Sequence, residues 1–179
     1  MLERKKLDKK EKREIRKIML KTLFLGIGNT IRGDDGIGIY VTEEIKKKLS
    51  YKKSNRINVI NTETAGLNLL ELIVGYSKLI IIDSIQVSID SELGQVYELK
   101  VNRFNSANYY PGSHDIDFSM LFRIGKKFKI KLPKDIKIYG IGIFSIKGFK
   151  QRCNPQLINM IPDIAQYIIN QELSSEEGN

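Results

Sequence analysis

The sequence predicts a single α/β domain with a mostly parallel, twisted sheet that is flanked by helices on both faces. Two observations support this fold class. Short apolar runs alternate along the chain with segments of helical periodicity, an order that implies crossover connections between parallel strands. The chain of 179 residues, of which 41% are hydrophobic, is also long and apolar enough to bury one sizeable core. Because the sequence contains no internal repeat and no linker, we expect one domain.

The first half of the chain predicts three strands and two helices. The run TLFLGIG at 22–28 is apolar and ends in glycine, as expected for a buried strand. The segment 37–49 places apolar residues at helical spacing and lysines in its last turn. INVINT at 57–62 indicates a second strand, LNLLELIV at 67–74 a short helix, and KLIIIDS at 78–84 a strongly apolar third strand.

The second half predicts two more strands and two more helices. GQVYELKV at 94–101 alternates between apolar and polar residues, which favours a more exposed strand. DIDFSMLFRIGKKF at 115–128 is typical of an amphipathic helix, and IKIYGIGIF at 136–144 of a further strand. The segment 154–173 predicts the final helix, with Asn154 as its cap and a proline as its first residue.

Basic residues are concentrated at the start of the chain. Residues 1–21 contain ten Lys and Arg against four Asp and Glu, so this segment holds +6 of the net charge of +9. A basic segment can contact nucleic acid, but no nucleic-acid-binding motif accompanies this one, and a solvated helix or frayed tail is the more frequent role. We therefore expect a basic N-terminal extension at 1–21, an α/β domain at 22–173, a disordered tail at 174–179, and no nucleic-acid partner.

The composition argues against a membrane protein and against a disulfide framework. The sequence contains no uninterrupted apolar stretch of about 18 residues, which a membrane-spanning helix requires. The N-terminus is too charged to hold the apolar core of a signal peptide. The single cysteine, Cys153, permits no disulfide within the chain. These features predict a cytoplasmic protein without a membrane partner.

The segment GIGNTIRGDDGIG at 26–38 places five glycines and two adjacent aspartates between the first strand and the first helix. It departs from the dinucleotide-binding fingerprint, because Ile31 occupies the position that needs the third glycine and the next glycine, Gly33, comes two residues late. Carboxylates at this point would also repel a pyrophosphate. An acidic residue at a helix start complements the positive end of the helix dipole. Capping therefore accounts for one aspartate and leaves the other unexplained.

Acidic and imidazole side chains are expected to meet at one end of the sheet. They are Asp34 or Asp35, then Asp83 after the third apolar run, and His114, the only histidine. Two carboxylates and one imidazole suit a divalent transition metal, and three protein ligands leave positions open for water or substrate, as in catalytic sites. Each residue also has an ordinary structural explanation, the acids as caps or turn residues and the histidine as a structural polar group.

A different chemistry would use the only cysteine. Cys153 precedes a predicted helix N-terminus, where a thiolate is stabilised. Together with His114 it would permit nucleophilic catalysis. An inert, small side chain is the more frequent role of a lone cysteine.

Several segments of the chain resemble a known family. FLGIGNTIRGDDGIGIYV follows its opening motif, which is an apolar strand, G-x-G-N, an acidic pair and G-x-G. The likeness continues in NTETAGLNLLELI (61–73), KLIIIDSI (78–85), GSHDIDFSML (112–121) and IYGIGI (138–143), and covers roughly 22–165. On these motifs the chain is similar to the hydrogenase maturation endopeptidases. Those enzymes remove a C-terminal peptide from the precursor of the large subunit of nickel–iron hydrogenases after nickel has been inserted.

The resemblance implies specific site residues. The family's metal-binding positions fall on Asp35, Asp83 and His114, which leaves Asp34 as the cap. The two aspartates Asp35 and Asp83 are also implied as catalytic, with one acting as general base on a water or with a metal polarising the scissile carbonyl. Substrate-binding residues are expected at Asn29, Gly36, Thr64 and Gly66.

The resemblance also implies a cofactor and a partner. The expected divalent metal is nickel that arrives with the substrate, and Zn²⁺ or Cd²⁺ would be acceptable substitutes at such ligands. The expected partner is the precursor of a nickel–iron hydrogenase large subunit, and the protein is expected to be a monomer. Two other functions stay open, namely a non-proteolytic metal-site checkpoint or chaperone module, and a hydrolase that uses Cys153 and His114.

Overall fold

A computed structural model describes residues 21–51, 55–64, 66–89, 92–100, 118–144 and 152–173. The expected basic extension, apart from its last residue, and the expected tail lie outside these ranges, as does His114. The strands are β1 (Thr22–Ile27), β2 (Ile57–Thr62), β3 (Lys78–Gln86), β4 (Val96–Lys100) and β5 (Asp135–Ile143). The helices are η1 (Thr30–Gly36), α2 (Ile37–Leu49), η2 (Gly66–Asn68), α3 (Leu69–Ile73), α4 (Phe118–Lys127) and α5 (Pro155–Leu173), where η marks a 3₁₀ helix.

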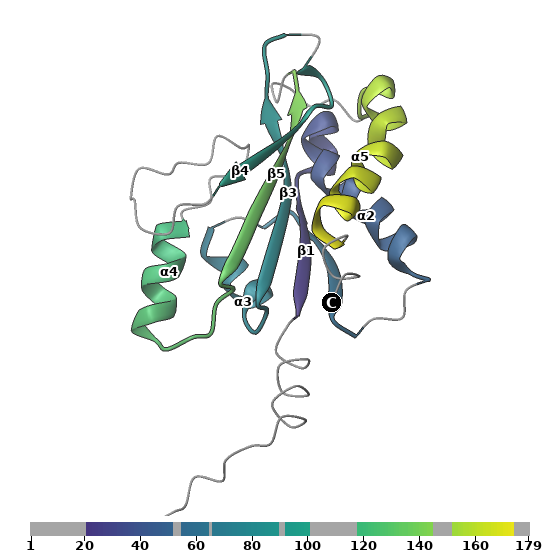
Figure 1. Cartoon of the computed structure of the whole chain (residues 1–179). Helices are drawn as coiled ribbons and strands as arrows, with labels where there is room; N and C mark the ends of the chain where they lie inside the picture. Colours follow the sequence, from purple (N-terminus) through teal and green to yellow (C-terminus); the bar gives the residue numbers. More distant parts are fainter. Residues whose placement is uncertain are drawn as a thin grey trace, which may run out of the picture.

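The strands form one five-stranded sheet in the order β2-β1-β3-β5-β4 (Figure 1). β2, β1, β3 and β5 are parallel, and β4 alone pairs antiparallel, at the edge next to β5. The predicted α/β fold with a mostly parallel sheet is therefore confirmed. A late strand that returns antiparallel along an edge is common on sheets of this kind.

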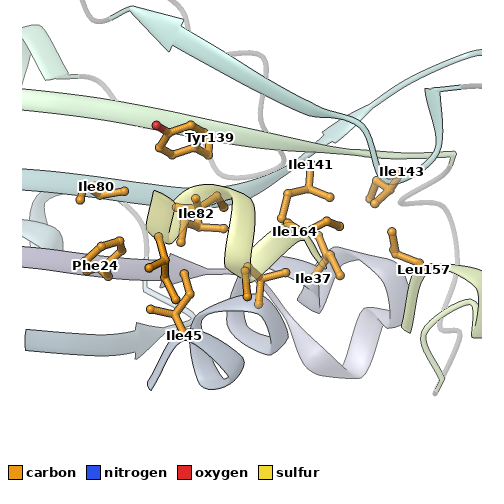
Figure 2. Close-up of a cluster of buried hydrophobic side chains, with 14 of the residues drawn as sticks. Phe24, Ile37, Ile45, Ile80, Ile82, Tyr139, Ile141, Ile143, Leu157 and Ile164 are labelled. Carbon is orange, nitrogen blue, oxygen red and sulfur yellow. The ribbon is translucent and has the colours of Figure 1, made fainter. Parts of the chain in front are cut away.

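Helices cover both faces of the sheet, as the sequence predicts. α2 and α5 lie side by side on one face and α3 and α4 on the other (Figure 1). The first face buries a cluster that includes Phe24, Ile82 and Ile164, of which Figure 2 shows a part. The second face buries a smaller cluster that includes Leu69 of α3 and Leu121 of α4. Strands covered on both sides explain why the apolar runs are continuous rather than alternating.

The element boundaries follow the sequence pattern closely, with one informative exception. α2 and β2 have the predicted bounds, and α5 begins at the proline that follows Asn154, whose side-chain oxygen accepts a hydrogen bond from the backbone N–H of Gln156 at 2.9 Å. β3 continues to Gln86, past the predicted end of the strand. Asp83 therefore lies inside β3, paired with Gly140 of β5, rather than at the end of the strand. Among the described residues, no helix combines the length and the hydropathy that crossing a membrane requires.

An ion-pair cluster fastens the end of α5 to the amino ends of β3 and β5. The buried carboxylate of Glu172 lies 2.7 Å from Lys78 Nζ and 3.0 Å from Lys137 Nζ. It also accepts a hydrogen bond from the hydroxyl of Tyr139. Burial acts to raise the pKa of Glu172, but the hydrogen bonds from Lys78, Tyr139 and Lys137 offset it and leave the pKa below its ordinary value. The folded state thus favours the charged carboxylate.

We expect Glu172→Gln to lower the free energy of unfolding by about 1–3 kcal/mol at neutral pH, because both lysines lose the charge they face. A carboxyl whose pKa is lowered by folding contributes stability above its unfolded pKa, and that contribution is lost as the pH falls through the folded pKa. The difference between wild type and variant should therefore shrink in acid. Urea unfolding near neutrality and at about pH 3 measures both values.

Glu98→Gln serves as the matched control for this change. Glu98 pairs with the same Lys137, at 3.7 Å, but its side chain is 40% exposed. An exposed pair of this kind contributes little, so the control should cost less than about 1 kcal/mol. A Glu172→Gln loss that is as large in acid as at neutrality would contradict the assignment of its stability to the carboxylate charge.

Candidate functional site

The site begins where β1 stops and its neighbour β3 continues. β1 ends at Ile27, whereas β3 runs on to Gln86 in register with β5. The last partner of β1 on β3 is Ile82, so Asp83 and the residues after it have no β1 residue beside them in the described register. This step at the carboxyl end of the sheet is filled by η1. Ligands of open α/β sheets bind beyond the carboxyl ends of the strands.

The glycines of the opening loop are required by close packing. A side chain at Gly38 would place its Cβ closer than 3.0 Å to the backbone oxygens of Ile27 and Ile82, so the first turn of α2 rests on the ends of two strands. A Cβ at Gly28 would lie 2.5 Å from the backbone oxygen of Asp35. Gly33 adopts a positive φ of 66°, which glycine tolerates. These contacts explain the glycine density without a phosphate ligand.

Two hydrogen bonds of Asn29 connect the beginning and the end of the 3₁₀ helix η1. The side-chain oxygen of Asn29 accepts a hydrogen bond from the backbone N–H of Ile31 at 3.0 Å, which makes it the cap of η1. The backbone N–H of Asn29 donates to the backbone oxygen of Asp35 at 3.2 Å. The loop thus folds back on itself and fixes where the two adjacent aspartates emerge.

Asp35 and Asp83 are fully buried, and Ser84 joins them. The hydroxyl of Ser84 donates to Asp35 Oδ1 at 3.0 Å, and the backbone N–H of Ser84 donates to Asp83 Oδ1 at 2.7 Å. The guanidinium of Arg32, whose side chain is 43% exposed, lies 3.8 Å from Asp35 Oδ2. The structure therefore brings Asp35 and Asp83, which the sequence analysis selected, to the same serine. The partly exposed guanidinium of Arg32 lies beside Asp35.

Asp34 has a different partner from the one predicted. The N-cap of α2 is Gly36, and no side-chain hydrogen bond caps that helix. Instead Asp34 Oδ1 accepts a hydrogen bond from the backbone N–H of Asn154 at 2.6 Å. The expectation that Asp34 caps the helix that follows it is wrong, because the loop turns this side chain toward the start of α5. Asp34 thus ties η1 to an element 120 residues away.

The other expected substrate-binding positions lie on two neighbouring loops. Asn29 caps η1 and Gly36 is its last residue, while Thr64 and Gly66 follow β2, the neighbour of β1 in the sheet. The hydroxyl of Thr30 in η1 donates to a carboxylate oxygen of Glu63 at 3.3 Å and links the two loops. Thr64 is half-buried, and its backbone N–H donates to the hydroxyl of Thr62 at 3.0 Å. The structure thus groups these residues at the same end of the sheet, and their contact with a substrate stays a prediction.

The surroundings of Cys153 do not favour a nucleophile. The side chain is buried, and burial, followed by the negative charge and hydrogen bond of Asp34, raises the pKa of its thiol to about 12. A thiol in that state carries almost no thiolate at neutral pH, and the thiolate is the reactive form. The geometry therefore supports the structural role of Cys153 over the hydrolase that would pair it with His114.

Two residues of the site escaped sequence reasoning. Ser84 follows the strand acid and carries no motif signal, since a serine after a buried run usually indicates a turn. Arg32 sits between the glycines of the opening loop, where a basic residue suggests only a solvated surface. Both become visible when η1 folds against the step between β1 and β3 and brings Asp35 to them.

Comparison with known proteins relates this chain to one family. A family model described as hydrogenase maturation protease matches residues 39–171, well over half of the chain. A putative hydrogenase maturation protease of Methanocaldococcus jannaschii is 27% identical over 127 residues, which are 68% of this chain and 71% of that protein. The hydrogenase expression/formation protein HupD of Rhizobium leguminosarum is 30% identical over 76 residues, which are 42% of this chain and 37% of that protein.

Solved structures show the same fold. The hydrogenase maturating endopeptidase HybD from E. coli superposes with a TM-score of 0.62 at 20% identity, covering 88% of this chain and 94% of that one. The NiFe hydrogenase maturation protease HycI from Thermococcus kodakarensis superposes with a TM-score of 0.61 at 17% identity, covering 86% and 96%. At these identities the structural likeness supports the fold alone.

We expect Gly38→Ala to destabilise the protein by more than about 2 kcal/mol, because backbone oxygens of two strands cannot both move away from a new methyl group. Gly75→Ala is the matched control, since a Cβ there would meet no atom within 4 Å and only the positive φ of 86° opposes it. The control should cost about 1 kcal/mol. Urea unfolding of both variants measures the difference, and equal losses would contradict the close approach of α2.

We expect Cys153 to react with iodoacetamide at least about 100-fold more slowly in the folded protein than in the urea-unfolded chain at pH 7.5, because burial and the raised pKa suppress the thiolate. Since the chain has one cysteine, the added mass reports this residue alone. Equal rates in the two states would show that the thiol is accessible and ionised, and would restore the cysteine-based alternative.

Proposed function

Because the chain belongs to the hydrogenase maturation protease family, we propose that it removes the C-terminal peptide from the precursor of a nickel–iron hydrogenase large subunit after nickel insertion. Membership makes it a hydrolase that acts as an endopeptidase. One observation supports this specific function: the buried side chains of Asp35 and Asp83 both accept a hydrogen bond from Ser84 at the carboxyl end of the sheet. On the resemblance of their motifs, we take these two acids as the counterparts of the family's metal-binding positions.

The donor chemistry of the site fits a nickel ion that belongs to the substrate. Within the described ranges, no group of three or more His, Cys, Asp or Glu could hold a metal ion. We propose that Asp35 and Asp83 supply two carboxylate ligands and that His114, which lies outside those ranges, supplies an imidazole. Such a mixed oxygen and nitrogen set suits Ni²⁺ and also accepts Zn²⁺ or Cd²⁺. Bound there, the metal would anchor the precursor and polarise a carbonyl as a Lewis acid.

The protein's own side chains would carry the remaining steps. Either Asp35 or Asp83 would accept a proton from the attacking water as general base. Asn29 and Gly36 on one loop, with Thr64 and Gly66 on the next, would bind the substrate chain beside the carboxylates. The partly exposed guanidinium of Arg32 lies 3.8 Å from Asp35 Oδ2, and we propose that it moves aside when the precursor's cation approaches. We place the reaction in the cytoplasm and assign it to a monomer.

The decisive experiment incubates the protein with nickel-loaded and nickel-free large-subunit precursors and reads the mass of the C-terminus. Loss of the C-terminal peptide from the nickel-loaded precursor alone is the expected result. Binding of the loaded precursor without any change in its length would contradict proteolysis and would favour the checkpoint or chaperone module. Equal cleavage of both precursors would contradict recognition through nickel.

We expect the two adjacent aspartates to respond differently to replacement by asparagine. Asp34→Asn keeps an oxygen that can accept the bond from Asn154, so cleavage should stay within about fivefold of wild type and stability within about 1 kcal/mol. Asp35→Asn removes a proposed ligand and general base, so cleavage should fall by at least about 100-fold. Both variants should melt within about 5 °C of wild type.

Precursor cleavage and thermal melts of the two asparagine variants test this difference. Each variant is the other's control, because they change neighbouring residues by the same chemistry. A larger loss of cleavage for Asp34→Asn than for Asp35→Asn would show that the ligand has been assigned to the wrong aspartate.

A further inference from the structure

Ser84 occupies a position from which one residue reaches both carboxylates. It lies in β3, in register with Ile141 of β5, and is fully buried. Its hydroxyl donates to Asp35 Oδ1 at 3.0 Å and its backbone N–H donates to Asp83 Oδ1 at 2.7 Å. The sheet fixes the backbone of Ser84, so strand geometry sets the direction of its N–H and the position from which its hydroxyl reaches Asp35.

The hydroxyl bond joins two elements that are far apart in the chain. Asp83 belongs to β3, whereas Asp35 is carried by η1, 49 residues earlier in the chain than Ser84. A carboxylate only accepts hydrogen bonds and a serine hydroxyl can donate one, so the polarity of the contact is fixed. Hydrogen bonds to charged acceptors are stronger than neutral ones. The contact therefore holds one carboxylate at a defined place relative to the other.

We propose that Ser84 is the positioning residue of the site, which sets the relative placement of Asp35 and Asp83 so that both carboxylates serve the same cation and the same water. This inference rests on the proposed function. Misplacing a reacting group by about 1 Å can lower the rate about 100-fold. Loss of the Ser84 hydroxyl should therefore lower kcat and weaken metal binding. Because the metal anchors the precursor, KM should rise by no more than the affinity for the metal falls.

A buried hydroxyl elsewhere in the same region provides the matched control. Thr42 in α2 is equally buried, and its hydroxyl donates to the backbone oxygen of Gly38 at 2.6 Å without touching either carboxylate. Thr42→Val removes that hydroxyl with almost no change of shape. Any general effect of deleting a buried hydroxyl bond, about 1 kcal/mol in stability, should appear in Thr42→Val as well as in Ser84→Ala.

The experiment compares Ser84→Ala, Ser84→Thr and Thr42→Val with wild type. Three quantities are measured: kcat and KM on the nickel-loaded precursor, the affinity for Ni²⁺ alone by calorimetric titration, and the melting temperature. We expect Ser84→Ala to lower kcat at least about tenfold, to weaken Ni²⁺ binding about tenfold, and to raise KM by no more than that same factor. Ser84→Thr, which keeps the hydroxyl, should recover most of both losses. Thr42→Val should lower only the melting temperature.

Three results would overturn the inference. One is a Ser84→Ala protein with wild-type kcat and wild-type Ni²⁺ affinity. Another is a Thr42→Val protein with the same loss of kcat, which would show a general packing effect. The third is a folded Ser84→Thr protein as impaired as Ser84→Ala. If wild type cleaves no precursor, the proposed function fails by itself, and the Ni²⁺ affinities of the Ser84 variants still decide the role of Ser84. If Ser84→Thr does not fold, the comparison of Ser84→Ala with Thr42→Val decides it.

Discussion

The site depends on the close approach of α2 to the ends of β1 and β3. Gly38 lies where any Cβ would overlap two backbone oxygens, one from each strand. Those atoms are held by sheet pairing and cannot turn away as a flexible side chain would. The start of α2 is therefore fixed, and η1 must cover the short distance between the end of β1 and that start. Within η1, Gly33 adopts a positive φ. The two acids that come next in η1 then contact different partners.

The two adjacent aspartates of the glycine-rich loop have different partners, which explains why the loop contains both. The backbone N–H groups in the first part of the loop donate within the protein, since that of Asn29 donates to the backbone oxygen of Asp35 and that of Ile31 to the side chain of Asn29. The loop instead sets the orientation of its two carboxylates. Asp35 points to Ser84 at the step in the sheet, while Asp34 holds the backbone at Asn154 before α5. Asp35 is thus assigned to the proposed chemistry, and Asp34 stabilises the structure around it.

Sequence reasoning succeeded wherever the determining signal is local. Apolar spacing and end lysines gave the bounds of α2, and the cap at Asn154 followed from the asparagine–proline pair that opens α5. It failed where partners are distant in the chain. Asp34 was assigned to the nearest helix because nothing in the sequence reveals a partner 120 residues away. Ser84 lacked any pattern, since its role appears only when η1 folds back on β3. The extension of β3 to Gln86 likewise depends on pairing with β5.

The helix α5 connects the site to the opposite end of the sheet. Its beginning is held by Asp34 through Asn154, and its end is held by the ion-pair cluster around Glu172, where the strands begin. Between these points it packs against α2 and shares the larger core with it (Figure 2). η1 is held by α2, which begins at the close contact of Gly38, and by the start of α5, through Asp34. Both helices belong to one continuous layer on a single face of the sheet. The placement of Asp35 is therefore a property of that whole layer, which explains how a short loop can hold a buried carboxylate in a fixed orientation.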